Sequence, residues 1–328
     1  TQRAGDPFLI FERSNSDVVS WTYEQFDELL GRVGYWLSER GVGDGSSVHL
    51  ALTNCPTFVA IWLAAVRLGA WIVPSDPMGS AGELAGHIQR TAPVVGFCAN
   101  SRSEVYRSSS GSLLMEEIDE DDAELSVFGG QVLAQWGDPH PTARAAVMFT
   151  SGTTGAPKGV EVTQANYAFA GRTMAAAGGL LPDDRQLVVL PLFHANAQYY
   201  SFASAISAGA SVALMPSFSA SGFLSQAARH RATAASLFAA PLRMILARGG
   251  PVDGLKLRQC WFAQNVTEDQ YETTVEWFGC RPRQLYGMTE TIPAVLTDWA
   301  ENPDPSSMGR VTPGCPVDVQ RPNGTSVD

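Results

Sequence analysis

Apolar and polar positions follow two rhythms along the chain, one typical of buried strands and the other of helices. The apolar runs at 46–52 and 70–74 have the length of strands, and residues 58–69 between them are long and apolar enough for a buried helix. The same succession returns at 186–190, 199–208 and 211–215. Strands that alternate with helices predict crossover connections and an α/β fold built of layered sheets.

The repeated rhythm predicts two α/β subdomains. We expect the first to cover about residues 1–140 and the second about residues 141–285, with a break near the polar stretch 101–112. With 328 residues, 45% of them hydrophobic and 17% charged, the chain is long and apolar enough to bury a sizeable core.

Charge and cysteine usage exclude several classes of protein. The net charge of −11 argues against a general nucleic-acid or anionic-membrane binder. No signal peptide is evident, and the apolar run 58–74 contains Arg67 and is short for a membrane span. The five cysteines are scattered without metal-ligand spacing, which predicts buried thiols in a reducing compartment and hence a cytoplasmic protein.

Candidate chemistry begins in the polar segment that follows the apolar run 145–149. The sequence Thr150-Ser-Gly-Thr-Thr-Gly-Ala-Pro-Lys-Gly159 combines hydroxyls, glycines and one of only two lysines in the chain. Glycines allow close backbone approach to an anion, hydroxyls donate hydrogen bonds, and lysine adds a point charge, so we interpret the segment as a polyphosphate-binding loop. The alternative is a polar surface linker.

The context of the loop favours the phosphate-binding interpretation. A predicted buried strand leads into it, and Thr163 is suited to cap a following helix over 164–177. The loop is not a P-loop of the Walker A type, because Pro157 precedes the lysine and Gly159 follows it where Ser or Thr is required.

Three blocks together resemble the adenylate-forming superfamily, which includes acyl-CoA synthetases, adenylation domains and luciferases. They are the loop 150–159, Pro191-Leu-Phe-His194 and Tyr286-Gly-Met-Thr-Glu290, and they stand in the family's order and near its spacing. The resemblance extends from Trp21-Thr-Tyr-Glu-Gln-Phe26 to Ser307-Met-Gly-Arg310. It is strongest to bacterial carboxylate–CoA ligases of the crotonobetaine/carnitine type.

The resemblance implies a fold and a set of nucleotide contacts. The fold is a pair of stacked α/β subdomains in αβαβα layers, followed by a nucleotide motif and the start of a β subdomain at about 286–328. The phosphates of ATP would be bound by Thr150, Ser151, Gly152, Thr153, Thr154, Gly155 and Lys158. Adenine and AMP would be bound by Gln264, Asn265, Tyr286, Gly287, Met288 and Thr289.

The resemblance also implies the catalytic groups and the acyl pocket. Lys158, Thr289, Glu290 and His194 are the catalytic candidates, and Glu290 is the candidate ligand for Mg²⁺, which commonly takes one or two carboxylates together with phosphate oxygens. The acyl pocket would be lined by His194, Asn196, Ala197, Gln198, Ile292 and Pro293. Polar groups at 196 and 198 favour a small, functionalised acid.

Each of these residues also has a structural interpretation. A histidine beside an aromatic residue is often a satisfied structural group, a tyrosine before glycine is often a packing residue, and a Thr-Glu pair often begins a helix. Two positions depart from the family's pattern. Residues 261–267 replace a glycine- and alanine-rich stretch against adenine, and Gln164 stands where relatives often have histidine.

The implied reaction is the ATP-dependent conversion of a small carboxylic acid to an acyl-adenylate, followed by thioester formation with coenzyme A. Transfer to an amine or to a carrier-protein thiol is the alternative, and a nucleotide-binding module without catalysis is a third. Intact Lys158, Thr289 and Glu290 argue against the third. The sequence leaves open the acid, the acceptor and whether the protein is a homodimer.

Members of the family continue well beyond the equivalent of Gly309-Arg310. By resemblance we expect a small mobile C-terminal domain outside the present sequence, with a further lysine that assists adenylation. We therefore expect the chain by itself to bind ATP weakly and to adenylate poorly.

Overall fold

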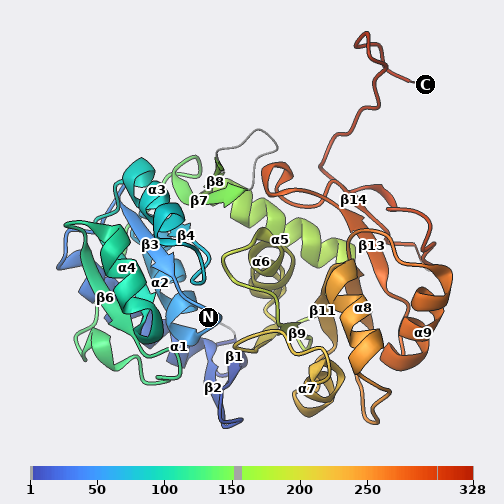
Figure 1. Cartoon of the computed structure of the whole chain (residues 1–328), viewed down its shortest axis with the longest axis horizontal. Helices are drawn as coiled ribbons and strands as arrows, with labels where there is room; N and C mark the ends of the chain where they lie inside the picture. Colours follow the sequence, from blue (N-terminus) through green and yellow to red (C-terminus); the bar gives the residue numbers. More distant parts are fainter. Residues whose placement is uncertain (1–2, 151–156, 301, 328) are drawn as a thin grey trace.

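Two β-sheets organise the chain, and helices cover both faces of each sheet (Figure 1). The computed structural model describes residues 3–150, 157–300 and 302–327. One sheet has six strands in the order β6-β5-β3-β4-β7-β8, and the other has nine in the order β15-β14-β13-β12-β11-β9-β10-β1-β2. Neighbouring strands are parallel except in the pairs β1–β2, β7–β8, β13–β14 and β14–β15. The mixed α/β fold predicted from the sequence is confirmed.

The strands of the six-stranded sheet are β3 (Ser47–Ala51), β4 (Trp71–Pro74), β5 (Val95–Ala99), β6 (Leu114–Ile118), β7 (Arg144–Thr150) and β8 (Lys158–Thr163). Those of the nine-stranded sheet are β1 (Pro7–Glu12), β2 (Val18–Thr22), β9 (Arg185–Val188), β10 (Ser211–Leu214), β11 (Ala234–Ser236), β12 (Gln259–Phe262), β13 (Arg283–Tyr286), β14 (Leu296–Thr297) and β15 (Arg310–Val311).

The α-helices are α1 (Tyr23–Ser38), α2 (Pro56–Arg67), α3 (Ala81–Thr91), α4 (Ser103–Ser110), α5 (Gln164–Gly178), α6 (Ala203–Ala208), α7 (Phe223–Arg229), α8 (Ala239–Arg248) and α9 (Glu268–Phe278). Three short 3₁₀-helices are η1 (Asn100–Arg102), η2 (Ser126–Phe128) and η4 (Thr289–Thr291), and η3 (Asn196–Phe202) is a π-helix that runs directly into α6.

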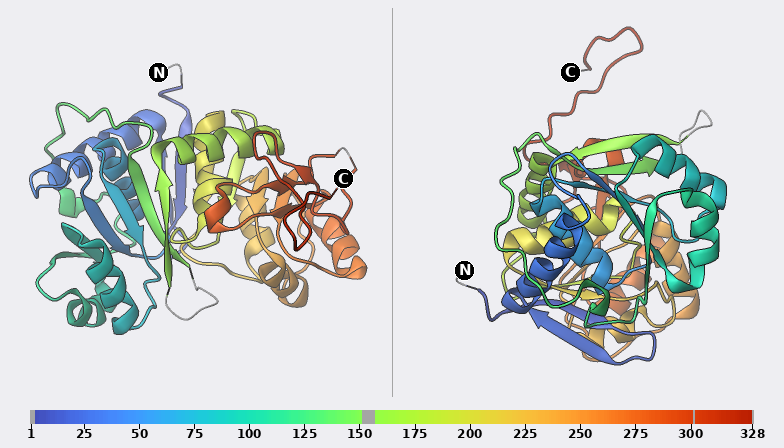
Figure 2. Two further views of the ribbon diagram at one scale, coloured as in Figure 1. Left: turned by 90° about the horizontal axis from the view of Figure 1, so that it is seen from above. Right: turned by 90° about the vertical axis from the view of Figure 1, so that its left-hand side faces the viewer.

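Successive side chains of a strand point to opposite faces of its sheet, so each sheet can pack against a layer on either side. In β10, Val212 and Leu214 face the central core, whereas Ala213 and the following Met215 belong to a separate cluster on the opposite face. The central core joins both sheets through α1, α2, α5 and α6. Helices α3 and α4 cover the outer face of the six-stranded sheet, and α7 and α8 cover that of the nine-stranded sheet (Figures 1 and 2). This is the predicted αβαβα arrangement.

Local signals in the sequence set several element boundaries. Helix α5 begins at the predicted cap: the Thr163 hydroxyl accepts a hydrogen bond from the Asn166 backbone N–H, and the Asn166 side chain accepts one from the Thr163 N–H. The apolar segment predicted as a buried helix is α2, which has Pro56 at its start, a position where proline is well tolerated.

The course of the chain through the sheets differs from the predicted division. Strands β1 and β2 belong to the nine-stranded sheet, although they lie in the first predicted subdomain, and β7 and β8 belong to the six-stranded sheet. The polar stretch 101–112, near which a break is predicted, holds α4 and joins two neighbouring strands, β5 and β6. Its polarity reflects one exposed helix face. The subdomain limits as folding units stay a prediction.

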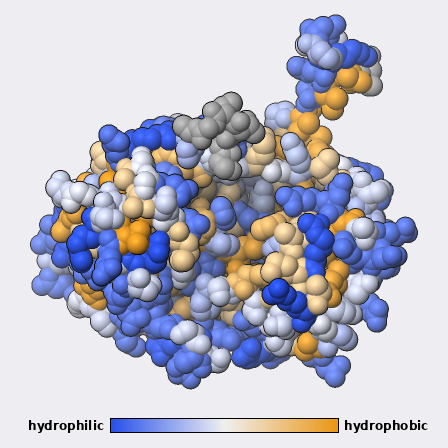
Figure 3. All heavy atoms as spheres, viewed as in Figure 1, coloured by the Kyte–Doolittle hydropathy of each residue, from blue (hydrophilic) through white to orange (hydrophobic). Residues whose placement is uncertain are grey.

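The face of the molecule seen in Figure 1 is largely polar. On the face seen in Figure 1, hydrophilic residues dominate the rim and hydrophobic ones gather toward the middle (Figure 3). No helix within the described ranges is long and apolar enough to cross a bilayer. The five cysteines are free thiols, four of them buried and Cys280 half-buried, which largely agrees with the prediction of buried thiols.

Candidate active site

A hairpin carries the two ends of the predicted phosphate loop. Strand β7 ends at Thr150, β8 begins at Lys158, and these two residues face each other in antiparallel register. Lys158 is exposed. The predicted phosphate ligands Ser151, Gly152, Thr153, Thr154 and Gly155 lie outside the described residues, so their contribution stays a prediction.

Helix α3 holds both ends of this hairpin. The His87 ring stacks on the Phe149 ring with centroids 3.9 Å apart and planes inclined by 4°. The Arg90 guanidinium lies 4.7 Å from the Phe149 centroid and donates a hydrogen bond of 2.6 Å to the Pro157 carbonyl. One helix therefore fixes the last residues before the loop and the residue just after its undescribed part.

The turn Pro191–His194 follows β9 and is fastened by buried amide side chains. Asn54, which follows β3 in the other sheet, accepts a hydrogen bond from the Leu192 N–H (2.7 Å) and donates to the Leu190 and Met215 carbonyls (3.0 and 3.1 Å). Gln198 donates to the Leu192 carbonyl at 2.6 Å. The turn is thus tied to both sheets where their parallel strands end, which is where α/β sheets commonly bind ligands.

His194 stands at the end of this turn with its side chain at the surface. Its backbone N–H donates to the Pro191 carbonyl, and its ring lies 4.3 Å from that of Phe193. Desolvation by the surrounding protein lowers the pKa of His194, and the nearby Asp76 carboxylate opposes part of that shift. The lowered pKa favours the neutral imidazole, which suits a contact or a proton acceptor better than a fixed cation.

The segment after β13 brings the third block to the same edge of the sheet. A Cβ on Gly287 would lie 2.8 Å from both the Ala294 Cα and the Tyr200 hydroxyl, so glycine is needed for this close approach. The Thr291 hydroxyl accepts from the Met288 N–H at 3.0 Å and donates to the Pro293 carbonyl at 2.7 Å. These contacts fix the backbone on both sides of Thr289 and Glu290.

Buried Tyr199 contacts strand β7 and is influenced by the charge of Glu290. The Tyr199 hydroxyl lies 3.7 Å from the sulfur of Met148 in β7, and the Glu290 carboxylate contributes to the raised pKa of Tyr199, whose main cause is burial. In the part of the chain that the structure describes, Glu290 forms no ion pair. Its exposed, unpaired carboxylate fits a ligand for Mg²⁺, which commonly takes one or two carboxylates together with phosphate oxygens. The described residues contain no cluster of three metal-binding side chains.

The remaining predicted nucleotide residues lie at strand ends beside this block. Tyr286 ends β13 with its side chain 42% exposed, so a flat aromatic face is open to a ligand instead of packed in the core. Gln264 and Asn265 follow β12 and are exposed, and Gln264 has a φ of +71°. The Gln264 carbonyl accepts a hydrogen bond from Gln284 at 3.4 Å, which ties this segment to β13.

The predicted acyl residues separate into two kinds. Gln198 is fully buried and both of its amide atoms are paired, one with the Leu192 carbonyl and the other with the Tyr167 hydroxyl, which argues for a structural role. Ala197 is also buried. By contrast, the Asn196 Oδ1 atom is buried and has no hydrogen-bond partner among the described residues. Such an acceptor is costly to leave unsatisfied.

Sequence reasoning missed several residues that shape the site, namely Asn54, Asp76, His87, Arg90 and Tyr200. Asn54 and Asp76 each follow a buried strand, a position that could have marked them as lying at the carboxyl edge of the sheet. No signal in the sequence connects His87 and Arg90 with a hairpin more than fifty residues later.

Comparisons with known proteins identify the family of the chain. The family model described as AMP-binding enzyme matches residues 1–327, and the chain belongs to this family. The chain is 30% identical over 306 residues to the crotonobetaine/carnitine–CoA ligase of Escherichia fergusonii, an alignment that covers 88% of the chain. It is also 30% identical over 315 residues to the enzyme of the same name from Salmonella typhimurium. The chain spans 59% of the length of these relatives.

Solved structures of ligases share the fold. The anthranilate CoA ligase AuaEII in complex with anthranoyl-AMP superposes with a TM-score of 0.89 at 21% identity, over 100% of this chain and 65% of that one. ATP-bound MatB from Rhodopseudomonas palustris superposes with a TM-score of 0.88 at 22% identity, over 100% of this chain and 66% of that one. At these identities the likeness establishes only that the chain shares the fold of these two ligases.

Proposed function

We propose that the protein activates a small carboxylic acid with ATP and then transfers the acyl group to coenzyme A. The observation that carries this proposal is that neighbouring residues of η3 contact both parts of the site: the Tyr199 hydroxyl lies 3.7 Å from the Met148 sulfur in β7, and the Tyr200 hydroxyl would lie 2.8 Å from a Cβ on Gly287. A carboxylate oxygen would attack the α-phosphate, pyrophosphate would leave, and the CoA thiol would then attack the acyl carbon and release AMP. Both steps need charge stabilisation and positioning more than a protein nucleophile.

The described residues suit distinct parts of ATP. Thr150 and Lys158, together with the loop between them, would bind the β- and γ-phosphates, and the Thr289 hydroxyl would donate to the α-phosphate. Glu290 would hold Mg²⁺, which neutralises phosphate charge when bound. Tyr286 would stack on adenine, with Gly287, Met288, Gln264 and Asn265 around it. Gly287 suits a tightly packed segment beside the adenine, because its lack of a side chain lets the backbone lie close to Ala294.

The acyl group would lie between the Pro191–His194 turn and the segment that contains Ile292 and Pro293. The unpaired Asn196 oxygen supports an acid with a hydroxyl or amino hydrogen, because such a donor would satisfy the buried acceptor. His194 would line the route by which the thiol reaches the acyl carbon. The names of the relatives support CoA as the acceptor. We place the protein in the cytoplasm, where ATP and CoA are available.

Exchange of labelled pyrophosphate into ATP tests adenylation. The full-length protein is assayed with a panel of small hydroxy, amino, aromatic and short branched acids, and we expect exchange that depends on one acid class. Product analysis with CoA, an amine or a carrier protein then identifies the acceptor. Binding of Mg-ATP without exchange for any acid would contradict the proposal and favour a binding module.

A further inference from the structure

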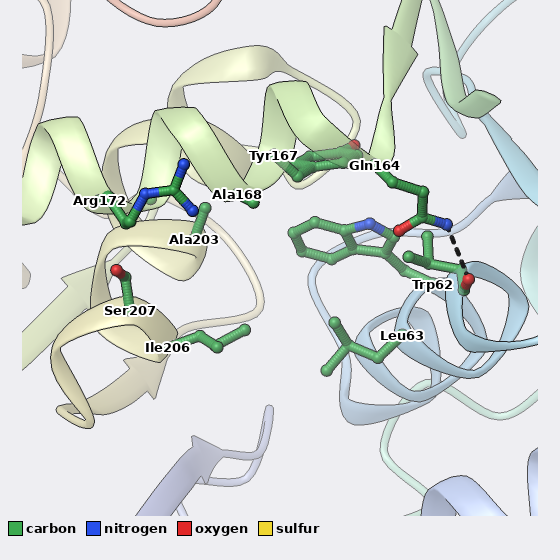
Figure 4. Close-up of a pocket in the computed structure, with 11 residues that line it drawn as sticks. Trp62, Leu63, Gln164, Tyr167, Ala168, Arg172, Ala203, Ile206 and Ser207 are labelled. Carbon is green, nitrogen blue, oxygen red and sulfur yellow. Dashed lines mark hydrogen bonds between the residues drawn. The ribbon is translucent and has the colours of Figure 1, made fainter. Parts of the chain in front are cut away.

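A cavity of about 470 Å³ lies between α2, α5 and α6, lined by none of the residues assigned to the nucleotide or acyl group (Figure 4). Its walls include Trp62 and Leu63 from α2, Tyr167 and Ala168 from α5, and Ile206 from α6. Its volume is within the range of small-molecule pockets. Ile206 is 40% exposed, so part of its side chain is accessible to a ligand in the cavity.

The helix packing explains why the cavity exists. A Cβ on Gly171 of α5 would lie 2.6 Å from the Ala203 carbonyl oxygen, so α5 and α6 are in close backbone contact there. Helix α2 approaches α5 at a different point, where the Trp62 and Tyr167 rings lie 5.4 Å apart. Beside them, Gln164 donates a hydrogen bond of 2.8 Å to the Val66 carbonyl (Figure 4). The space between these two contacts is left unfilled.

The aromatic wall is rigidly held. The Tyr167 hydroxyl donates to Gln198, and Gln198 in turn donates to the Leu192 carbonyl at 2.6 Å. The other wall, Trp62, is nearly buried and packs on Phe202 with centroids 5.9 Å apart. A pocket whose aromatic walls are already fixed loses little conformational entropy when a ligand enters.

Two arginines lie near the cavity, and they differ in whether their charge is paired. Arg172 lies on its rim, and in the described part of the chain its guanidinium forms no ion pair. The adjoining groove, which shares Leu63, Val66 and Ile206 with the cavity, is also lined by Asp27 and by Arg67. That charge is already neutralised, since Arg67 pairs with Asp27 at 2.5 Å and stacks on Trp136 at 3.9 Å. Arg172 is therefore the cation available to a ligand.

We infer that this cavity is a second binding site, for an amphipathic organic anion. The apolar body lies against Trp62, Tyr167 and Ile206, and the anionic group pairs with Arg172. An apolar floor alone would accept many neutral molecules, and an exposed arginine alone would bind anions weakly. Their combination in one cavity selects a ligand that has both properties, and this inference does not depend on the proposed catalytic function.

Paired fluorescent probes test the site on the full-length protein. The anionic probe is 1-anilinonaphthalene-8-sulfonate, and N-phenyl-1-naphthylamine has the same aromatic body without the charge. We expect saturable binding of the anionic probe to the wild type. Arg172→Gln should raise its Kd about 10-fold, the size expected for loss of a charge-assisted hydrogen bond. The Kd of the neutral probe should not change. Arg67→Gln is the matched control and should change the Kd less than about twofold, because its charge is already paired.

A filling variant locates the probe. Ala168→Phe should abolish saturable binding of the anion, whereas Ala165→Phe, at an exposed position of the same helix outside the cavity lining, should not. Equal affinities in the wild type and in Arg172→Gln would overturn the inference. So would displacement of the probe by Mg-ATP, which would place it in the nucleotide site, or an affinity that falls as the protein dimerises, which would show that a second copy covers the cavity.

Discussion

The groups that frame the candidate active site and the groups that would react in it differ in burial and in hydrogen bonding. Asn54 and Gln198 are buried, and their amides are paired with backbone or side-chain atoms. Lys158 and Glu290 are exposed and form no ion pair within the described residues.

The difference shows how one fold can be both rigid and reactive. Buried amides leave few alternative arrangements, because breaking their hydrogen bonds would leave unsatisfied polar atoms inside the core. Exposed charges without partners keep their hydrogen-bonding capacity for a ligand. We call the buried amides Asn54 and Gln198, with the backbone they hold, the frame of the site. Substitutions in the frame should therefore reduce the free energy of unfolding, and substitutions of the reacting groups Lys158 and Glu290 should reduce activity alone.

The largest effect on activity is expected from Glu290→Ala. Loss of the proposed Mg²⁺ ligand should reduce pyrophosphate exchange about 100-fold or more, with the free energy of unfolding unchanged, because the side chain is exposed and unpaired. Glu276→Ala removes an exposed carboxylate of α9 and serves as the control. Activity close to that of the wild type in Glu290→Ala would remove this residue from the site.

The framing residue Asn54 should show the opposite behaviour. Asn54→Ala leaves the Leu192 N–H and the Leu190 and Met215 carbonyls without their partner, so we expect a loss of about 2–4 kcal/mol in the free energy of unfolding. Denaturant titration measures it, with the exposed Asn100→Ala as the control. A loss below about 0.5 kcal/mol would mean that the frame is not held by this amide.

Gly309, in the segment Ser307–Arg310 where the family resemblance ends, tests the described backbone by overpacking. A Cβ on Gly309 would lie 2.2 Å from the Thr297 carbonyl carbon, and its φ is +90°. Gly309→Ala should therefore cost about 2–3 kcal/mol through backbone displacement and strain. Gly43→Ala, with open space around its Cα, should have almost no such effect in the same thermal melts. Equal melting temperatures for both variants would contradict the described backbone path.

Buried His49 in β3 should make the free energy of unfolding depend on pH. Burial lowers the pKa of His49 to about 3, and its ring nitrogens lie 2.7 Å from the Tyr106 hydroxyl and 3.0 Å from the Ser75 hydroxyl. Below pH 6.5 the unfolded chain binds a proton that the folded chain excludes, so stability should fall by up to about 1.4 kcal/mol per pH unit as the pH decreases toward 3.

Urea titrations at pH 7 and pH 5.5 measure this dependence. His49→Gln cannot titrate, so the fall in stability between the two pH values should be smaller in this variant than in the wild type. The same fall in both proteins would assign the pH dependence to other groups.

The smallest effect should come from Arg90, which connects the frame with the reacting loop. Arg90→Gln removes the hydrogen bond to the Pro157 carbonyl and the contact with the Phe149 ring. We expect the KM for ATP to rise about 3- to 10-fold, in keeping with a lost charge-assisted hydrogen bond at an exposed position, and kcat to change little. A fall in kcat at unchanged KM would indicate a role in chemistry instead of loop placement.

Much of this picture was predictable from the sequence. The apolar runs located β7, α2 and β10, and Thr163 marked the start of α5, because these signals are local and act within one or two turns of chain. The three family blocks begin at or just after the ends of β7, β9 and β13, so their place at strand ends was predictable, whereas the roles of their residues stay predictions. Strand β7 belongs to the six-stranded sheet and β9 and β13 to the nine-stranded one, so the approach of the blocks to one another depends on how the two sheets pack.

The remaining features depend on contacts between distant parts of the chain. The first two strands join the sheet of the second half, since β1 pairs with β10 in parallel register across about two hundred residues. Gln198 was predicted as an acyl contact by resemblance, yet its partners come from α5 and from the turn after β9. Periodicity in a single segment carries no information about such partners.

Transfer of isotope from the acid to the nucleotide tests the central claim most directly. The full-length protein is incubated with ATP, CoA and an acid labelled with ¹⁸O in its carboxylate, and the nucleotide products are analysed by mass spectrometry. Attack of the carboxylate on the α-phosphate predicts AMP that carries one ¹⁸O atom, together with unlabelled pyrophosphate. Formation of ADP with the label in inorganic phosphate would show attack at the γ-phosphate and would contradict the proposed reaction.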